Sequence, residues 1–148
     1  MDQNKINGFR EPQIFQLYDF LVAYEDSGIR KYKSTKKMLE EHPELFELNE
    51  QIKYVECKKS DAIEMKDIDF KQFHNKIYFT KCKGNNLLSF LAHLRNTIAH
   101  GCAVEHNGNV LITNFANPIY RPIDFSARGC IDFSVIRNFT DILKKIEL

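Results

Sequence analysis

Residues 84–101, GNNLLSFLAHLRNTIAHG, contain the clearest element of the sequence and decide the fold prediction. Their apolar residues recur at intervals of three and four, and on a helix this spacing places them within roughly 60° of one another. Asparagines at 85 and 86 provide an N-cap, and Gly101 stands where a left-handed C-terminal cap belongs. We therefore expect a helix from Leu87 to His100 whose apolar stripe consists of Leu87, Leu91, Leu94 and Ile98.

The sequence before this segment also favours helices. Glu11-Pro12 suits a helix start, since proline is tolerated in the first turn, and Ser27-Gly28 ends the apolar periodicity that follows. A short helix is expected over residues 34–41, and another somewhere within residues 44–59. Residues 1–10 are expected to form a loose polar arm.

After the predicted helix, the apolar residues no longer follow helical spacing. Asn107-Gly108 separates two short extended segments and favours a type I′ turn, so residues 103–113 are predicted to form a β-hairpin. The dipeptides Asn117-Pro118 and Arg121-Pro122 indicate a loop. A short extended segment is predicted over residues 127–133. Asp132 or Ser134 caps a last amphipathic helix.

These elements predict a single domain over residues 1–148. Its predicted class is mainly α, an up-and-down helical bundle of four to five helices with a β-hairpin inserted before the last helix. Residues 42–83 contribute least to this prediction, because residues 63–79 give only mixed short elements.

Composition limits the classes of function. The chain has 21 basic and 20 acidic side chains, so any contact with nucleic acid must come from a local patch. No apolar run approaches the roughly 20 residues that span a bilayer, and no membrane association is expected. The four cysteines lack a Cys-x-x-Cys pair and the first residues do not resemble a signal peptide, which favours a cytoplasmic protein with reduced thiols.

The predicted helix ends in a set of residues that suits phosphodiester chemistry. Asn96 and His100 are four residues apart and share one helix face, opposite the apolar stripe, and the long side chain of Arg95 reaches the same region. Histidine transfers protons near neutral pH, and arginine stabilises charge that develops on phosphate oxygens. Asn96 orients His100 or donates to the phosphate. No metal ion or cofactor is required by this set.

The spacing of Arg95, Asn96 and His100 resembles the defining motif of the HEPN superfamily, in which arginine and a polar residue precede a histidine. The resemblance covers roughly residues 84–148, and in the first half it extends only to helices of suitable length. It implies a HEPN-like helical bundle and a toxin- or defence-type ribonuclease that leaves a 2′,3′-cyclic phosphate. It further implies a homodimer formed through the motif helix and a possible antitoxin partner. The small residues Ala92 and Ala99 would allow a partner helix to approach closely.

One position departs from a branch of that family. Where toxins silenced by nucleotidyl transfer carry tyrosine two places after the histidine, this chain has Cys102, so that mode of regulation is not expected.

Other interpretations remain open. A non-catalytic HEPN module that binds RNA or nucleotide would carry the same residues, and Asn96 and His100 would then only cap a helix. A zinc site at His100, Cys102 and His106 lacks paired ligand spacing and a fourth ligand, and nothing orders Cys102 against a base for nucleophilic catalysis.

The run of residues 30–37, RKYKSTKK, is the strongest basic cluster of the sequence. It makes Lys31, Lys33, Lys36 and Lys37 weaker candidates for RNA contact, together with His93, although a solvated surface is the simpler explanation for all five. Four phenylalanines, at 70, 73, 79 and 90, are expected in the core and not on a base-stacking platform.

Overall fold

The computed structural model describes residues 6–58, 67–81, 83, 85–117 and 121–146 and has an α+β fold. The expected mainly helical bundle is therefore wrong, because a five-stranded mixed sheet forms one layer of the molecule. The hairpin that was predicted as an insertion is one edge of this sheet.

The sheet has the strand order β1-β2-β5-β4-β3. Only β1 and β2 are parallel, and the remaining neighbours are antiparallel. The strands span Lys53–Cys57 (β1), Lys76–Thr80 (β2), Val104–His106 (β3), Asn109–Asn117 (β4) and Arg121–Asp132 (β5).

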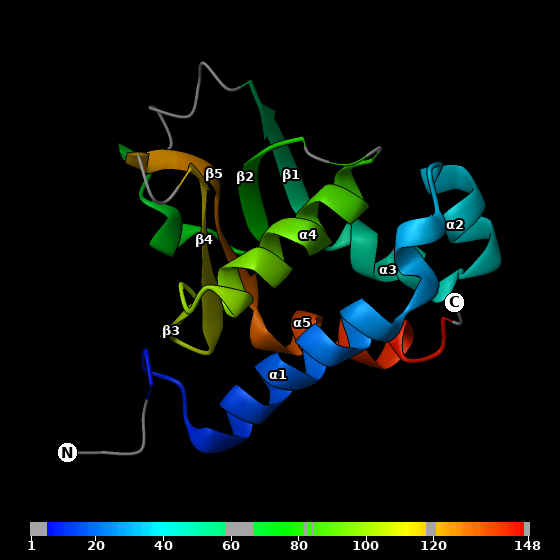
Figure 1. The fold of residues 1–148 in the computed structure, drawn as a ribbon, viewed down its shortest axis with the longest axis horizontal. Helices are drawn as coiled ribbons and strands as arrows, with labels where there is room; N and C mark the ends of the chain where they lie inside the picture. Colours follow the sequence, from blue (N-terminus) through cyan, green and yellow to red (C-terminus); the bar gives the residue numbers. More distant parts are fainter. Residues whose placement is uncertain (1–5, 59–66, 82, 84, 118–120, 147–148) are drawn as a thin grey trace.

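The helices lie mainly on one side of this sheet (Figure 1). Helix α4 crosses the sheet and contacts β2 and β4, while α1 contacts both α4 and α5. The helical elements are α1 (Glu11–Asp26), η1 (Gly28–Lys31), α2 (Thr35–Glu41), α3 (Glu44–Glu50), η4 (Phe70–Gln72), α4 (Asn86–Ala99) and α5 (Phe133–Leu143). None of the helices in the described ranges combines the length and the hydrophobicity needed to cross a membrane.

The core lies between the sheet and the helices. Phe79 of β2 and Phe90 of α4 are fully buried there, as expected. A smaller cluster of Phe70, Leu111 and Cys130 forms on the other face of the sheet, because alternate residues of a strand point to opposite faces. Phe73 packs at the margin of this second cluster.

The helix predicted somewhere within residues 44–59 is present as α3, but it is short and strand β1 follows it. The helix ends at Glu50, and Lys53–Cys57 is extended. The aromatic and β-branched pair Tyr54-Val55 favours a strand, but its parallel partner β2 begins more than twenty residues later. A parallel pair needs such a long connection, so no turn signal adjoins β1.

The predicted hairpin is confirmed in detail. Asn107 has φ 52° and Gly108 has φ 81°, the positive values that a type I′ turn requires. Its second strand continues to Asn117, so the predicted loop at 117–122 is narrower than expected, and residues 118–120 lie outside the described ranges. The short segment predicted at 127–133 belongs to the much longer β5.

Residues 6–10 of the expected loose arm are folded against the domain, contrary to expectation. Ile6 and Phe9 form an antiparallel bridge, and the Phe9 ring is buried edge-on against Phe133. The arm therefore belongs to the packed domain. Residues 1–5 of the predicted arm lie outside the described ranges.

Candidate functional site

Helix α4 begins and ends as the sequence predicts. The Asn85 side chain accepts a hydrogen bond from the Leu88 N–H at 2.8 Å, which caps the first turn. At the other end Gly101 has φ +71°, and the N–H groups of Gly101 and Cys102 bond to the carbonyls of Ile98 and Thr97. This pair of bonds is the Schellman arrangement, and it fixes the backbone that carries His100.

The face of α4 opposite the apolar stripe is open only in its last turns. Ser89, Ala92 and His93 were expected on a polar or partner-facing side, but all three are buried. Arg95 and Asn96 are half-buried, and His100 is exposed. The motif residues therefore occupy the part of α4 that the fold leaves accessible.

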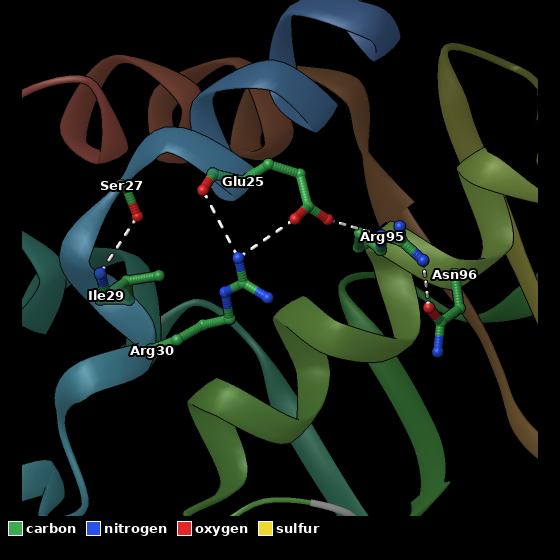
Figure 2. A network of polar contacts seen from close by, with 6 residues as sticks. All are labelled: Glu25, Ser27, Ile29, Arg30, Arg95 and Asn96. Atoms are coloured by element: carbon green, nitrogen blue, oxygen red, sulfur yellow. Dashed lines mark hydrogen bonds and ion pairs between the residues drawn. The ribbon is translucent and has the colours of Figure 1, made fainter. Parts of the chain in front are cut away.

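Arg95 is held by a carboxylate from helix α1. Its Nε lies 2.9 Å from Glu25 Oε1, and its Nη1 donates to Asn96 Oδ1 at 3.0 Å. The other oxygen of Glu25 lies 3.1 Å from Arg30 Nη2, so the carboxylate stands between two guanidinium groups (Figure 2). Exposed ion pairs of this kind contribute at most about 1 kcal/mol each, and an anionic ligand would displace Glu25 at modest cost.

These side chains line a cleft of about 360 Å³. Among the described residues, Arg30, Lys83 and Arg95 bring three positive charges to it, against the single carboxylate of Glu25. Charge-assisted hydrogen bonds from such donors suit a phosphate group. The described lining residues are Tyr24, Glu25, Arg30, Lys83, Ala92, Arg95 and Asn96.

His100 lies one turn beyond the cleft. Its backbone N–H bonds to the Asn96 carbonyl, and the four-residue spacing places both side chains on one face, about 6 Å apart along the helix axis. In the described part of the chain, no residue forms a hydrogen bond or ion pair with the exposed His100 ring. The structure thus brings Arg95 and Asn96 together and leaves the imidazole accessible beside them.

Asn7 supports the backbone next to His100, and the sequence analysis missed it. Its side-chain amide donates to the Gly101 carbonyl at 2.9 Å and to the Ala103 carbonyl at 3.1 Å. Asn7 and Gly8 both have positive φ values, as do Asn107 and Gly108. The Asn-Gly dipeptide was therefore a signal for a second tight turn within the presumed loose arm.

His93 is not the solvated histidine that was expected. Its Nε2 lies 2.8 Å from the Thr80 carbonyl and its Nδ1 lies 3.0 Å from Asn114 Nδ2. These contacts fit a neutral ring that donates from Nε2 and accepts at Nδ1, and burial lowers the pKa of His93. With the ring buried and both nitrogens engaged, His93 links α4 to β2 and β4 and has no atom to offer to RNA.

Three of the four candidate lysines line a second hollow, of about 550 Å³. Lys31, Lys33 and Lys37 surround it together with Tyr32, Ser34 and Glu41. Lys36 is also exposed on α2, but it is not among the described residues that line this hollow.

A polar cluster lies beside those lysines. The Tyr32 hydroxyl donates to the Glu41 carboxylate and lies 2.9 Å from His42 Nε2. The hydrogen bond to Glu41 raises the pKa of Tyr32 to about 12 and lowers the pKa of Glu41. Tyr32 is thus a neutral hydroxyl near neutral pH, and the Glu41 carboxylate is ionised.

The alternative sites gain no support from the geometry. Within the described ranges, no group of three or more histidine, cysteine, aspartate or glutamate side chains is arranged to hold a metal ion. Cys102 is half-buried, and its thiol lies 3.7 Å from the His100 carbonyl, which is no general base.

The sequence predicted the motif residues but not the other residues that line the cleft. Glu25, which contacts both arginines, is 70 residues away from Arg95 along the chain, and neither Glu25 nor the lining residue Lys83 belongs to the motif. No protein-family model matches this chain, and no curated protein or solved structure shows significant similarity to it.

Proposed function

We propose that this protein is a metal-independent endoribonuclease that cleaves RNA through the substrate's own 2′-hydroxyl. The observation that carries the proposal is the cleft in which Arg95 and Asn96 stand beside two further cations, with the exposed His100 one turn away on the same helix. The Arg-Asn-x-x-x-His spacing, which resembles the HEPN motif, supports the same activity.

Each motif residue has a defined role in this proposal. The cleft binds the scissile phosphate, and Arg95 turns from Glu25 to the phosphate oxygens, where it stabilises the charge of the transition state. His100 removes the 2′-hydroxyl proton or protonates the leaving 5′-oxygen. Asn96 orients Arg95, to which it is already hydrogen-bonded. The products are a 2′,3′-cyclic phosphate and a 5′-hydroxyl end.

We also propose that the active form is a homodimer that associates near the end of the motif helix. Ile6 and Tyr18 are large exposed apolar residues, and with Gly101 they border a cavity of about 80 Å³ next to the His100 loop. Ala92, by contrast, is buried in the cleft wall and offers no contact to a partner helix, whereas Ala99 is exposed. The cytoplasm is the proposed compartment, where RNA is present and the thiols of Cys57, Cys102 and Cys130 stay reduced.

The test is RNA cleavage in the presence of EDTA by the wild type and by the Arg95→Ala and His100→Ala variants. Loss of acid–base catalysis should lower the rate by at least about 100-fold in His100→Ala. Matched controls are His74→Ala and Arg137→Ala, which remove an exposed histidine and an exposed arginine from other surfaces and should cleave like the wild type. Equal activity in all five proteins would show a contaminating nuclease and contradict the proposal.

The second candidate is a non-cleaving module that binds RNA or nucleotide at the same cleft. The cluster of cations in the cleft favours it as much as it favours the enzyme. It predicts RNA binding that is weakened by Arg95→Ala, with no cyclic phosphate formed by any of the proteins.

A further inference from the structure

The cleft at Arg95 is one end of a longer depression. A hollow of about 200 Å³ adjoins it and shares Tyr24, Arg30 and Lys83 with it. The same hollow shares Tyr32 and Lys33 with the 550 Å³ hollow at α2. Because they share lining residues, the three hollows lie next to one another from Asn96 to Lys37, along α4, η1 and the start of α2, and we call this row of hollows the track.

The track is positive although the molecule is nearly neutral. Of the residues that the structure describes, six cationic and two anionic side chains line it, a local excess of four positive charges in a chain whose net charge is +1. The cations are Arg30, Lys31, Lys33, Lys37, Lys83 and Arg95, and the anions are Glu25 and Glu41.

Both anions in the track are already engaged. Glu25 is bound by Arg30 and Arg95, and Glu41 accepts the Tyr32 hydroxyl. Lys33 and Lys37, by contrast, are exposed on one rim of the track. A row of cations along a depression binds the backbone of a polyanion and raises its local concentration.

We infer that the track holds a single-stranded segment of RNA, which runs from the scissile phosphate at Arg95 past Arg30 and Lys83 to Lys33 and Lys37. This inference rests on the proposed function, and it specifies the substrate as an unpaired stretch of several nucleotides. A duplex is not the expected occupant, because double-stranded RNA is recognised across its wide, shallow minor groove, by domains that span about 16 base pairs, and the track is a row of small hollows.

The contacts are to phosphates, because lysine and arginine side chains carry the positive charge of the track and all of those named except Arg95 are exposed. Tyr24 and Tyr32 line it, but both are buried within the walls and present no open ring face for stacking. Single-stranded DNA of equal length therefore occupies the same track and inhibits cleavage competitively. It is not cleaved, because it lacks the attacking 2′-hydroxyl.

The test is binding of labelled oligoribonucleotides of about four, eight and twelve nucleotides, a range typical of single-strand sites. Fluorescence anisotropy at several salt concentrations would compare the wild type with a Lys33→Ala/Lys37→Ala double variant. Its matched control is Lys71→Ala, an exposed lysine of η4. The double variant should bind the longest strand about tenfold more weakly, with a logarithmic salt slope smaller by about 1.4, which corresponds to two lost phosphate contacts.

Several results would overturn the inference. They are affinity that does not rise with strand length, an equal loss in Lys71→Ala, or a duplex of the same length that binds as tightly as the single strand. A much weaker affinity for single-stranded DNA than for RNA would refute contact through phosphates alone.

The experiments distinguish failure of the inference about the track from failure of the nuclease proposal. Length-dependent binding that needs Lys33 and Lys37, without cleavage, supports the track and refutes the nuclease. Cleavage that needs His100, with unchanged binding by the double variant, supports the nuclease and refutes the track.

Discussion

Glu25 is the acidic residue among the described lining of the Arg95 cleft, and its charge opposes the binding of a phosphate. It neutralises part of the field of Arg95 and Arg30 in the free protein, at distances of 2.9 and 3.1 Å. A phosphate that enters must replace it as the partner of the guanidinium groups. Glu25 therefore sets how tightly the empty cleft attracts any anion.

Replacing Glu25 by glutamine should strengthen RNA binding. The variant keeps the side-chain shape but removes the competing charge, so affinity for a single strand should rise by about two- to tenfold at low salt. Anisotropy titrations would measure this, with Asp19→Asn as the control on the same helix, where Asp19 pairs with Lys144 at 2.8 Å. Weaker binding by Glu25→Gln would contradict a competing role and assign Glu25 to positioning Arg95.

His93 should make stability depend on pH. Burial lowers its pKa in the folded protein, so the unfolded chain binds the proton more readily. Its contribution is complete above the ordinary histidine pKa of about 6.5 and is lost as pH falls from there through the lowered folded-state value.

Urea unfolding at pH 7.5 and pH 5.5 would measure that contribution. On going from pH 7.5 to pH 5.5, the wild-type protein should lose more free energy of unfolding than His93→Gln, whose side chain cannot titrate. The His100→Gln variant, which changes an exposed histidine, should behave as the wild type. At pH 7.5 His93→Gln should be less stable by about 1–3 kcal/mol, because the partners of the ring lose hydrogen bonds. Identical pH dependence in all three proteins would be evidence against this account.

At the scale of elements, β5 depends on a glycine. A Cβ at Gly129 would lie 2.6 Å from the Lys76 carbonyl oxygen and 2.9 Å from the Ile77 Cα of the neighbouring strand. Gly129 pairs with Ile77 on β2 and with Ile112 on β4, so it sits in the middle of the sheet.

Gly129→Ala should destabilise the protein by about 2–3 kcal/mol, because backbone atoms of two paired strands must separate. Gly101→Ala is the matched comparison: it has φ +71° but no atom within 4 Å of the added Cβ, and backbone strain alone should cost about 1 kcal/mol. Urea unfolding would compare the two. If Gly101→Ala lost more free energy of unfolding than Gly129→Ala, β2 and β5 would be able to move apart at little cost, contrary to this prediction.

The elements differ in how far the sequence predicts them. The limits of α1, α2 and α4 and the hairpin turn follow from caps, glycines and periodicity, which are local signals. The polar face expected on α4 is present only in its last turns, where Asn96 is half-buried and His100 is exposed, and the sequence carried a signal for this. Residues 87–94 contain only Ser89 and His93 as polar residues, which indicates a helix buried on all sides.

At the scale of the whole molecule, the sheet could not be predicted from local patterns. Strand β5 is covered over much of both faces, so Ala127, Cys130 and Ile131 are buried together and the alternation typical of a half-exposed strand is missing. Its neighbours β2 and β4 come from opposite sides of α4 in the sequence. The same limit applies to the track, because η1 and α2 lie more than forty residues before Lys83 in the sequence.

The contact between Asn7 and the Gly101 and Ala103 carbonyls has a consequence for genetics. Because the start of the chain steadies the loop that carries the imidazole, a screen for inactive mutants would recover changes at position 7 alongside those of the distant motif. Plotted along the sequence, the mutations at position 7 and those in the motif would suggest two separate functional regions, although both affect the same turn of the folded chain.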